Sequence, residues 1–452
     1  MTNQEEKLLL SDIIEELLEA LDREDFARIS STLESLNAAE IAHILEATPS
    51  DSREHIFKRA PQSELGEILL HMGDVAAAEL AGHLKPPALK VLAEKLDSSD
   101  LAELIDVLSD ESADDLLSGM SEQRRERIKA TLSYPEESAG RLMQSDAVNV
   151  RPDVSVETAL RYLRILDDVP SDTVVLMVVD RTGSFGGCVT ILDLIRSDEE
   201  VLIKDIMDSD VRTLSPHDSE SEVAMLFENH DLIAAAVVDE HEKFLGRIVI
   251  DDVVDVIREQ GEHAFLGQAG LDDEEDLFAP MIPSAKRRAV WLAANLLTAF
   301  LAAWVIGLFE ATLEQIVALA ILMPIVASMG GIAGSQTLTL TIRGIALGQV
   351  SASNARQLLN KELGISFLNG CLWSVVVGLV TWMWFKDPML AYVIGLAMVL
   401  NMLVAAFAGI VVPLFLKQIH LDPALSGVVV VTTITDVVGF VSFLGLATLF
   451  LL

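Results

Sequence analysis

The chain has 452 residues, with 69 Asp and Glu against 32 Lys and Arg, for a formal net charge of −37. The charge is uneven, because residues 1–285 hold 63 acidic and 24 basic residues whereas residues 286–452 carry a formal charge of +2. So acidic a region excludes nucleic acid and anionic lipid headgroups as its partners. The two cysteines, Cys188 and Cys371, lie far apart, so no disulfide framework or zinc site can be read from the sequence.

Residues 1–135 are predicted to form an acidic domain made only of helices. Apolar residues recur at spacings of three and four, with Ser, Asp or Pro at the starts of the segments. Short units such as QSELGEILLHM and SSDLAELIDVL repeat loosely, which is typical of stacked helix pairs in a superhelix. The amphipathic, acidic beginning MTNQEEKLLL is not that of a signal peptide. We expect a scaffold or a sensor domain without chemistry of its own.

Residues 136–204 and 205–260 contain two copies of one βαβ-type unit. Each copy has a short strand, a Pro, a helix, an apolar strand ending in Val-Asp, a Gly-containing turn, a strand and a final helix. This order, with the apolar runs VVLMVV and IAAAVV, resembles a tandem pair of CBS domains. Pairs of this kind commonly bind adenosine nucleotides, so the resemblance implies a site for ATP or a related nucleotide.

The nucleotide-binding pattern of CBS domains is met in the first copy by Gly187, Thr190 and Asp193. Asp193 would accept hydrogen bonds from ribose hydroxyls, and the Thr190 hydroxyl would reach the phosphates. In the second copy Val249 stands where the hydroxyl residue is expected, three positions before Asp252. We therefore expect at most one nucleotide site, and a CBS pair with a purely structural role is the alternative.

From Lys286 onward the chain is predicted to be a membrane domain, because five stretches reach the roughly 20 apolar residues that span a bilayer. They lie at about 289–309, 315–342, 363–385, 389–416 and 425–451. The flanks that share the side of residues 1–285 hold seven Lys or Arg residues, and the opposite flanks hold only Lys386. The positive-inside rule therefore places residues 1–285 in the cytoplasm and the C-terminus outside.

One carboxylate, Asp436, falls in the middle of the last span, within TTITDVV. An ionised Asp at mid-membrane costs at least about 2.5–3.5 kcal/mol on insertion scales, so it usually faces a wet pathway or a partner. Thr433 and Thr435 add hydroxyl oxygens of the kind that hard cations accept as ligands. We expect a cation site on an ion pathway; the alternative is a structural ion pair, for which only Arg343 lies near another span.

The second span is rich in small and polar residues, in the sequence LMPIVASMGGIAGSQTLTLTIRG. Pro324 is expected to break its helix. Gly330, Gly331 and Gly334 would allow close backbone approach, as small residues do between membrane helices.

Taken over nearly its whole length, the chain resembles the MgtE family of magnesium channels. The order of acidic helical domain, CBS pair, basic hinge and five spans agrees with that family. The local motifs that carry the resemblance are YPEESAGRLM at Tyr134 to Met143, RRAVWLAANLL at Arg287 to Leu297, the segment from Pro324 to Gln336, Lys361-Glu362, Asp422-Pro423, and Thr433, Thr435 and Asp436. The resemblance implies a multi-domain α-helical membrane protein with an N-terminal helical superhelix, an α/β CBS pair, a connecting (plug) helix at 261–285 and a five-helix transmembrane domain at 286–452.

In function, the resemblance implies a homodimeric Mg²⁺-selective channel of the plasma (inner) membrane, surrounded by lipid, and not an enzyme. Asp436 matches the pore carboxylate of the family, one from each subunit meeting on the dimer axis. Mg²⁺ sheds water reluctantly and is held by one or two carboxylates while it keeps several waters. In the family, cytosolic Mg²⁺ holds the acidic domain, the CBS pair and the connecting helix in a closed state. Mutual repulsion of the acidic residues would separate them when Mg²⁺ is low.

The regulatory acids of the family are matched in part. Asp252 and Asp255 coincide with gating acids, whereas Gln260 and His263 stand where acids are expected. The residues predicted to bind regulatory Mg²⁺ are Asp252, Asp255, Glu259 and Glu262. The acidic run at 272–276 is either a substitute for the missing acids or, as we favour, a solvated charge run.

Three other functions remain as alternatives. Transport of Mn²⁺ or Co²⁺ fits the same oxygen ligands, while the absence of Cys and His near Asp436 disfavours Zn²⁺ and Cu⁺. A proton-coupled carrier would need a second titratable group at mid-membrane, and Glu310 and Glu314 lie at an outer edge. No nucleophile-base pair, P-loop or metal triad indicates a membrane enzyme. Another departure from the family is Ile332, which stands where many relatives have Asn.

Overall fold

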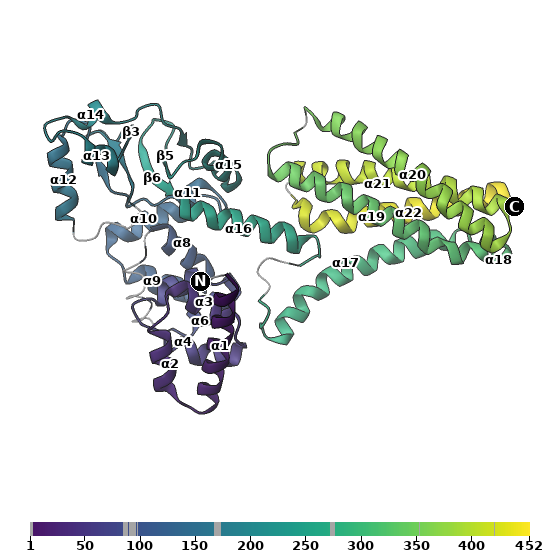
Figure 1. Ribbon diagram of the computed structural model, residues 1–452, viewed down its shortest axis with the longest axis horizontal. Helices are drawn as coiled ribbons and strands as arrows, with labels where there is room; N and C mark the ends of the chain where they lie inside the picture. The colour runs from purple at the N-terminus through teal and green to yellow at the C-terminus, as the bar shows by residue number, and fades with distance from the viewer. Residues whose placement is uncertain are drawn as a thin grey trace. The chain divides into compact units, whose positions relative to one another are not determined.

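The computed structural model describes residues 3–84, 89, 96, 98–166, 173–271, 276–351, 353–419 and 421–452. It divides into two compact units (Figure 1). The polar unit comprises residues 1–259 with 274–280, and the membrane unit comprises residues 260–273 with 281–452.

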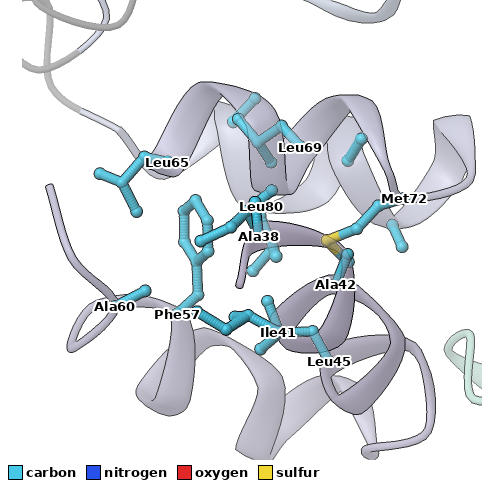
Figure 2. Packing of buried hydrophobic residues seen from close by; sticks show 14 of the residues in the cluster. Ala38, Ile41, Ala42, Leu45, Phe57, Ala60, Leu65, Leu69, Met72 and Leu80 are labelled. Carbon is cyan, nitrogen blue, oxygen red and sulfur yellow. The ribbon is translucent and has the colours of Figure 1, made fainter. Parts of the chain in front are cut away.

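Short helices stack in the N-terminal part of the polar unit, as the spacing of apolar residues predicts. The described helices are α1 (Asn3–Asp22), α2 (Phe26–Leu33), α3 (Ala38–Glu46), α4 (Ser50–Phe57), α5 (Leu65–Leu70), α6 (Asp74–Gly82), α8 (Ser98–Val107), α9 (Asp110–Ser118) and α10 (Glu122–Leu132). Cap residues fix where several begin; Asn37, for example, forms a capping box with Glu40 at the start of α3. Figure 2 shows how side chains from successive helices, among them Ile41, Phe57 and Met72, meet in one apolar core.

The two predicted copies each form a three-stranded sheet with flanking helices. The first contains α11 (Ala139–Leu142), β1 (Asn149–Val150), α12 (Val156–Ile165), β2 (Val175–Val179), β3 (Phe185–Thr190), α13 (Ile191–Arg196) and α14 (Ile203–Ile206). The second contains β4 (Thr213–Leu214), α15 (Glu220–His230), β5 (Ala234–Val238), β6 (Phe244–Val249) and α16 (Ile250–Gly267). In both sheets the middle strand pairs with a parallel strand on one side and an antiparallel strand on the other.

The two sheets pack on each other through an apolar layer. Met177 of β2 and Ala236 of β5 are buried in it, and the rings of Phe185 and Phe244 stack with centroids 6.3 Å apart. The turns before β3 and β6 also pair, since Phe185 N–H donates to the Glu242 carbonyl. The expected α/β pair is thus one compact body.

Among its described residues, the membrane unit contains five long apolar helices, the number predicted from the sequence. They are α17 (Met281–Gly307), α19 (Ala318–Ala346), α20 (Ala355–Phe385), α21 (Pro388–Gln418) and α22 (Pro423–Leu451). A short helix that the sequence analysis did not foresee, α18 (Glu310–Gln315), joins the first two. Within the described residues, the expected connecting helix at 261–285 is represented by the last turns of α16 and the first turn of α17.

Local sequence explains where the last two helices begin. Asp387 and Asp422 are the N-caps of α21 and α22, each followed by Pro at the first helical position and each accepting two backbone N–H bonds. The Asp side chain accepts hydrogen bonds from free N–H groups of the first turn, and Pro has the fixed φ that the first helical position favours. The predicted break at Pro324 is wrong, because α19 is continuous through it. Pro324 is the seventh residue of α19, so it lacks the N–H that would bond the Ala320 carbonyl, but the loss of this one hydrogen bond leaves the helix continuous.

Candidate functional site

Asp436 lies at the middle of α22, half-buried against the rest of the membrane unit. Within the described part of the chain no side chain pairs with it by a hydrogen bond or an ion pair. The structural ion pair with Arg343 is therefore not formed in a single chain. A carboxylate in a membrane helix without a cationic partner needs water or a bound cation to offset its charge.

The threonines beside Asp436 use their hydroxyl protons within α22. Thr433 Oγ1 donates to the Val429 carbonyl at 2.6 Å and Thr435 Oγ1 donates to the Thr432 carbonyl at 2.9 Å. Thr433 is half-buried, so its oxygen keeps lone pairs that can face an ion or its waters. Thr435 is fully buried, between α22 and α19.

Two glycines of α19 differ in what they contact. A Cβ built on Gly334 would lie 2.7 Å from Val431 Cγ1 and 3.5 Å from Thr435 Cγ2, so only glycine allows α19 to approach α22 this closely. A Cβ on Gly331 would meet nothing within 4 Å. Gly334 therefore serves packing inside the chain, whereas Gly331 lies on an open face of the same helix.

That open face of α19 lines a groove of about 790 Å³, whose surface is mostly apolar but includes hydroxyl and amide side chains. Its lining residues are Ser328, Gly331, Ile332, Ser335, Gln336, Thr339 and Leu340. Hydroxyl and amide groups are not expected on a helix face that meets only lipid. Ile332, the departure from the family pattern, lies in this groove and is 55% exposed.

A group of three or more Asp, Glu, His or Cys that could hold a metal ion is not found among the described residues. One chain therefore offers the single carboxylate Asp436 at its membrane-embedded site.

A second candidate region is an acidic surface of the polar unit, centred on Glu103 of α8. Although Glu103 keeps contact with solvent, its pKa is raised to about 8, first by burial among the surrounding helices and then by negative neighbours. The charged neighbours are Glu259, Asp100, Asp74 and Asp255. Like charges that approach one another disfavour the ionised state, and a bound cation would relieve that repulsion.

Glu220, the first residue of α15, belongs to the same surface. Burial raises the pKa of Glu220 to about 7, and the nearby carboxylates of Glu137 and Glu259 raise it as well. Glu259 thus interacts electrostatically with Glu103 of the N-terminal helices and with Glu220 of the second α/β copy. The sequence analysis predicted Glu259 but did not find Glu103 or Glu220, because nothing in their local sequence distinguishes them from other surface acids.

The other predicted regulatory acids fall in different surroundings. Asp255 contributes to the negative field at Glu103, whereas Asp252 accepts a hydrogen bond from Val249 N–H at the start of α16. Glu262 is exposed and belongs to the membrane unit. His263, at a place where an acid was expected, has Nε2 3.1 Å from Oδ2 of Asp422, the residue that caps α22.

Asp276 does not fit the solvated charge run that we favoured for 272–276. Its carboxylate receives two hydrogen bonds from the buried guanidinium of Arg53, and its side chain is 8% exposed. The remaining residues of that run, 272–275, lie outside the described residues.

The predicted nucleotide residues Thr190 and Asp193 contact each other. Thr190 is the N-cap of α13, and the two side chains form a capping box in which the Thr190 hydroxyl donates to Asp193. Gly187 has φ of +143°, and a Cβ there would lie 2.2 Å from the Asp208 carbonyl oxygen. In the second copy the backbone N–H of Val249 donates to Asp252, but Val249 has no hydroxyl that could form the second bond of the box.

Comparison with known proteins connects these features. Residues 323–446 match the MgtE family, described as a divalent cation transporter, residues 36–137 match the MgtE intracellular N domain, and residues 203–259 match a CBS domain. The magnesium transporter MgtE of Thermus thermophilus is 31% identical over 330 residues, which are 72% of this chain and 73% of that protein. The magnesium transporter MgtE of Bacillus subtilis is 27% identical over 324 residues, 72% of each chain.

A solved structure, the cytosolic domain of the Mg²⁺ channel MgtE in complex with ATP, is also similar. It is 28% identical with a TM-score of 0.50, and the match covers 53% of this chain and 98% of that one. Together with the five apolar helices, these similarities describe a multi-pass membrane protein with a cytosolic N-terminal region, of a transporter class rather than an enzyme class. The chain belongs to the MgtE family.

Proposed function

We propose that this protein is a homodimeric Mg²⁺ channel that takes Mg²⁺ into the cell and closes when cytosolic Mg²⁺ is high. The observation that carries the proposal is Asp436, a half-buried carboxylate at the middle of a membrane helix and without a partner among the described residues. Two such carboxylates, one from each subunit, would attract a hydrated divalent cation without stripping its water shell. Relatives named as magnesium transporters support the choice of ion.

The groove on α19 supports the homodimer. The Thr339 hydroxyl donates to Gln268 Oε1 at 3.4 Å, whereas the exposed Gln336 amide needs protein or water opposite it at membrane depth. A second copy would cover this face, and Gly331 would permit close approach there. Asp436 would then line the water-filled space enclosed by the two copies.

The acidic surface of the polar unit supports closure by cytosolic Mg²⁺. Repulsion between Glu103, Glu259 and Glu220 opposes the compact arrangement of the N-terminal helices, the second α/β copy and α16. A cation that binds the compact arrangement better than the open one shifts the equilibrium toward compaction. Asp252, Asp255, Glu259 and Glu262 remain the proposed regulatory ligands on α16.

Nucleotide is the proposed second regulator. The first α/β copy has the Thr190–Asp193 pair, and the similar cytosolic domain was solved in complex with ATP. The excess of basic residues on the side of residues 1–285 supports an inner-membrane protein whose C-terminus lies outside.

Transport of other divalent cations is the second candidate, because the matching family is described as divalent cation transporters. The oxygen ligands around Asp436 accept Mn²⁺ and Co²⁺ as well as Mg²⁺. Selectivity therefore has to be measured rather than read from the ligand set.

The test is cation uptake into liposomes that contain the purified protein, with Mg²⁺, Mn²⁺, Co²⁺ and Ca²⁺ compared. We expect Mg²⁺ uptake, loss of that uptake in Asp436→Ala, and weak uptake at best in Asp436→Asn, because an amide orders water but carries no charge. Full Mg²⁺ uptake by a well-folded Asp436→Ala protein would show that the pathway lies elsewhere. Higher rates for Mn²⁺ or Co²⁺ than for Mg²⁺ would favour the second candidate.

A further inference from the structure

Asn401 is a fully buried amide in the middle of α21, where that helix meets both α19 and α22. Only 1% of its surface is exposed. Its Nδ2 donates to the Val326 carbonyl of α19 at 2.9 Å. A Cβ built on Gly330 would lie 2.2 Å from this nitrogen, and one built on Gly439 of α22 would lie 2.7 Å from it. The carboxamide therefore lies between two glycines that leave space for it and for no further atom.

The carbonyl oxygen of the Asn401 amide, Oδ1, is buried and makes no hydrogen bond within the described residues. A buried acceptor without a partner is unfavourable, and an apolar side chain of similar shape would avoid that loss. An apolar side chain at position 401 would not leave a buried acceptor unpaired, so this oxygen gives the asparagine no advantage in stability.

The Asn401 amide contacts two helices: α19, which carries the groove, and the turn of α22 that follows Asp436. Val326 and Gly330 are followed on α19 by the groove residue Gly331. On α22, Gly439 lies three residues after Asp436, within one helical turn of it. The contact therefore sets how close α22, which carries Asp436, lies to α19, which carries the groove.

We propose that Asn401 is a positioning residue that fixes Asp436 relative to the groove on α19, and so tunes the affinity and selectivity of the cation site. This inference rests on the proposed role of Asp436 in the ion pathway. Two carboxylates that recognise a hydrated ion must stand at a distance set by its water shell, and Mg²⁺ demands near-ideal octahedral geometry. Loosening the junction of α19, α21 and α22 would then affect Mg²⁺ more than the less demanding Ca²⁺.

The experiment compares Asn401→Leu with the matched control Met398→Leu, in full-length protein reconstituted into liposomes. Met398 lies almost one turn earlier on α21 and is also fully buried, but it donates no hydrogen bond to α19. For each protein, uptake is measured over a range of Mg²⁺ and of Ca²⁺ concentrations, and thermal stability is measured in detergent. We expect Asn401→Leu to unfold near the wild-type temperature, to need a several-fold higher Mg²⁺ concentration for half-maximal uptake, and to discriminate less between Mg²⁺ and Ca²⁺. Met398→Leu should match the wild type in all three.

If Asn401→Leu does not fold, Asn401→Ala combined with Gly439→Ala, which returns part of the lost volume without the amide, is measured instead. Wild-type half-saturation and selectivity in a folded variant would overturn the inference, as would a loss of maximal uptake that only follows the loss of folded protein. Asp436→Ala in the same assay keeps the two proposals apart. Unchanged uptake in Asp436→Ala removes the proposed function, whereas lost uptake there with an unaffected Asn401→Leu removes only the role of Asn401.

Discussion

Arg53 and Asp276 form a bidentate ion pair between residues that are far apart in sequence, with nitrogen–oxygen distances of 2.6 and 3.0 Å. The Arg53 side chain is fully buried, and its Nε also donates to the Leu45 carbonyl at 2.9 Å. Asp276 in turn accepts from Phe278 N–H at 2.8 Å, which holds the turn just before α17. The turn before α17 is therefore held to the N-terminal helices by the Arg53 guanidinium.

We expect Asp276→Ala to destabilise the polar unit by about 3–5 kcal/mol, the usual cost of removing one partner of a buried ion pair. Glu79 Oε2 lies 3.9 Å from Arg53 Nη1, too far to replace the two hydrogen bonds that Asp276 accepts. The measurement is the urea dependence of proteolysis of the polar unit in the full-length protein. The matched control is Glu19→Ala, which breaks the exposed pair between Arg23 and Glu19, where both side chains are more than half exposed. Exposed pairs of this kind contribute about 0–1 kcal/mol. Equal effects of the two substitutions would show that burial of Arg53 does not matter.

The raised pKa values of Glu103 and Glu220 predict that compaction of the polar unit depends on pH when Mg²⁺ is absent. Both carboxyl groups have a folded-state pKa above their ordinary value, about 8 for Glu103 and about 7 for Glu220. Their contribution to the compact state is therefore fully present below about pH 4.5 and is lost as pH rises through 7 and 8. We expect greater resistance to protease at about pH 6 than at about pH 8.5 in a chelating buffer.

Bound Mg²⁺ should stabilise the compact polar unit as protonation of Glu103 and Glu220 does. Added Mg²⁺ should restore protection at the higher pH, and Glu103→Gln should reduce both the pH dependence and the requirement for Mg²⁺. Glu228→Gln is the control, because Glu228 is an exposed acid of α15 in the same unit and belongs to none of the proposed sites. Protection that is the same at both pH values, with and without Mg²⁺, would remove the acidic surface as the gating element.

The capping box of α13 makes a prediction about nucleotide. Asp193→Ala should weaken ATP binding by about tenfold or more, since hydrogen bonds to a charged group contribute roughly 1.5–3 kcal/mol. The matched control is Glu222→Ala, which removes the acid of an equivalent capping box with Ser219 at the start of α15. Calorimetry on the full-length protein measures both. Equal weakening by the two variants would mean that helix capping, and not a ligand contact, explains the effect.

The sequence predicted the elements of this protein better than it predicted their contacts. Five spans, two α/β copies and a stack of short helices follow from apolar spacing and turn residues, which are local signals. The helix break at Pro324 was predicted wrongly, because a proline removes one N–H donor and the other backbone hydrogen bonds of α19 keep the helix continuous. Asn401 was missed since a single amide in an apolar span gives no sign of the glycines on two other helices that surround it. The contact of Arg53 with Asp276 was missed for the same reason, as it joins distant segments.

Gly331 and Gly334 of α19 provide a final prediction that separates packing within one chain from assembly of two. A methyl group on Gly334 would lie 2.7 Å from Val431 Cγ1, so Gly334→Ala must push α19 away from α22. Overpacking of this kind costs about 1–3 kcal/mol, which a lower unfolding temperature of the full-length protein should reveal. Gly331→Ala meets no atom within 4 Å in its own chain, and alanine favours the helix by roughly 0.5–1 kcal/mol over glycine. We therefore expect Gly331→Ala to keep or raise the stability of each chain.

The same substitution should nevertheless impair function if a second copy covers the groove. A methyl group at position 331 would enter the space that the proposed partner or the hydrated ion occupies, so cross-linking into dimers or Mg²⁺ uptake should fall although each chain stays folded. Cross-linking in membranes and uptake into liposomes measure these two quantities separately. Unchanged dimers with reduced uptake would place Gly331 on the ion pathway, and reduced dimers would place it at the subunit contact. A Gly331→Ala protein that matches the wild type in both would show that the groove on α19 faces lipid.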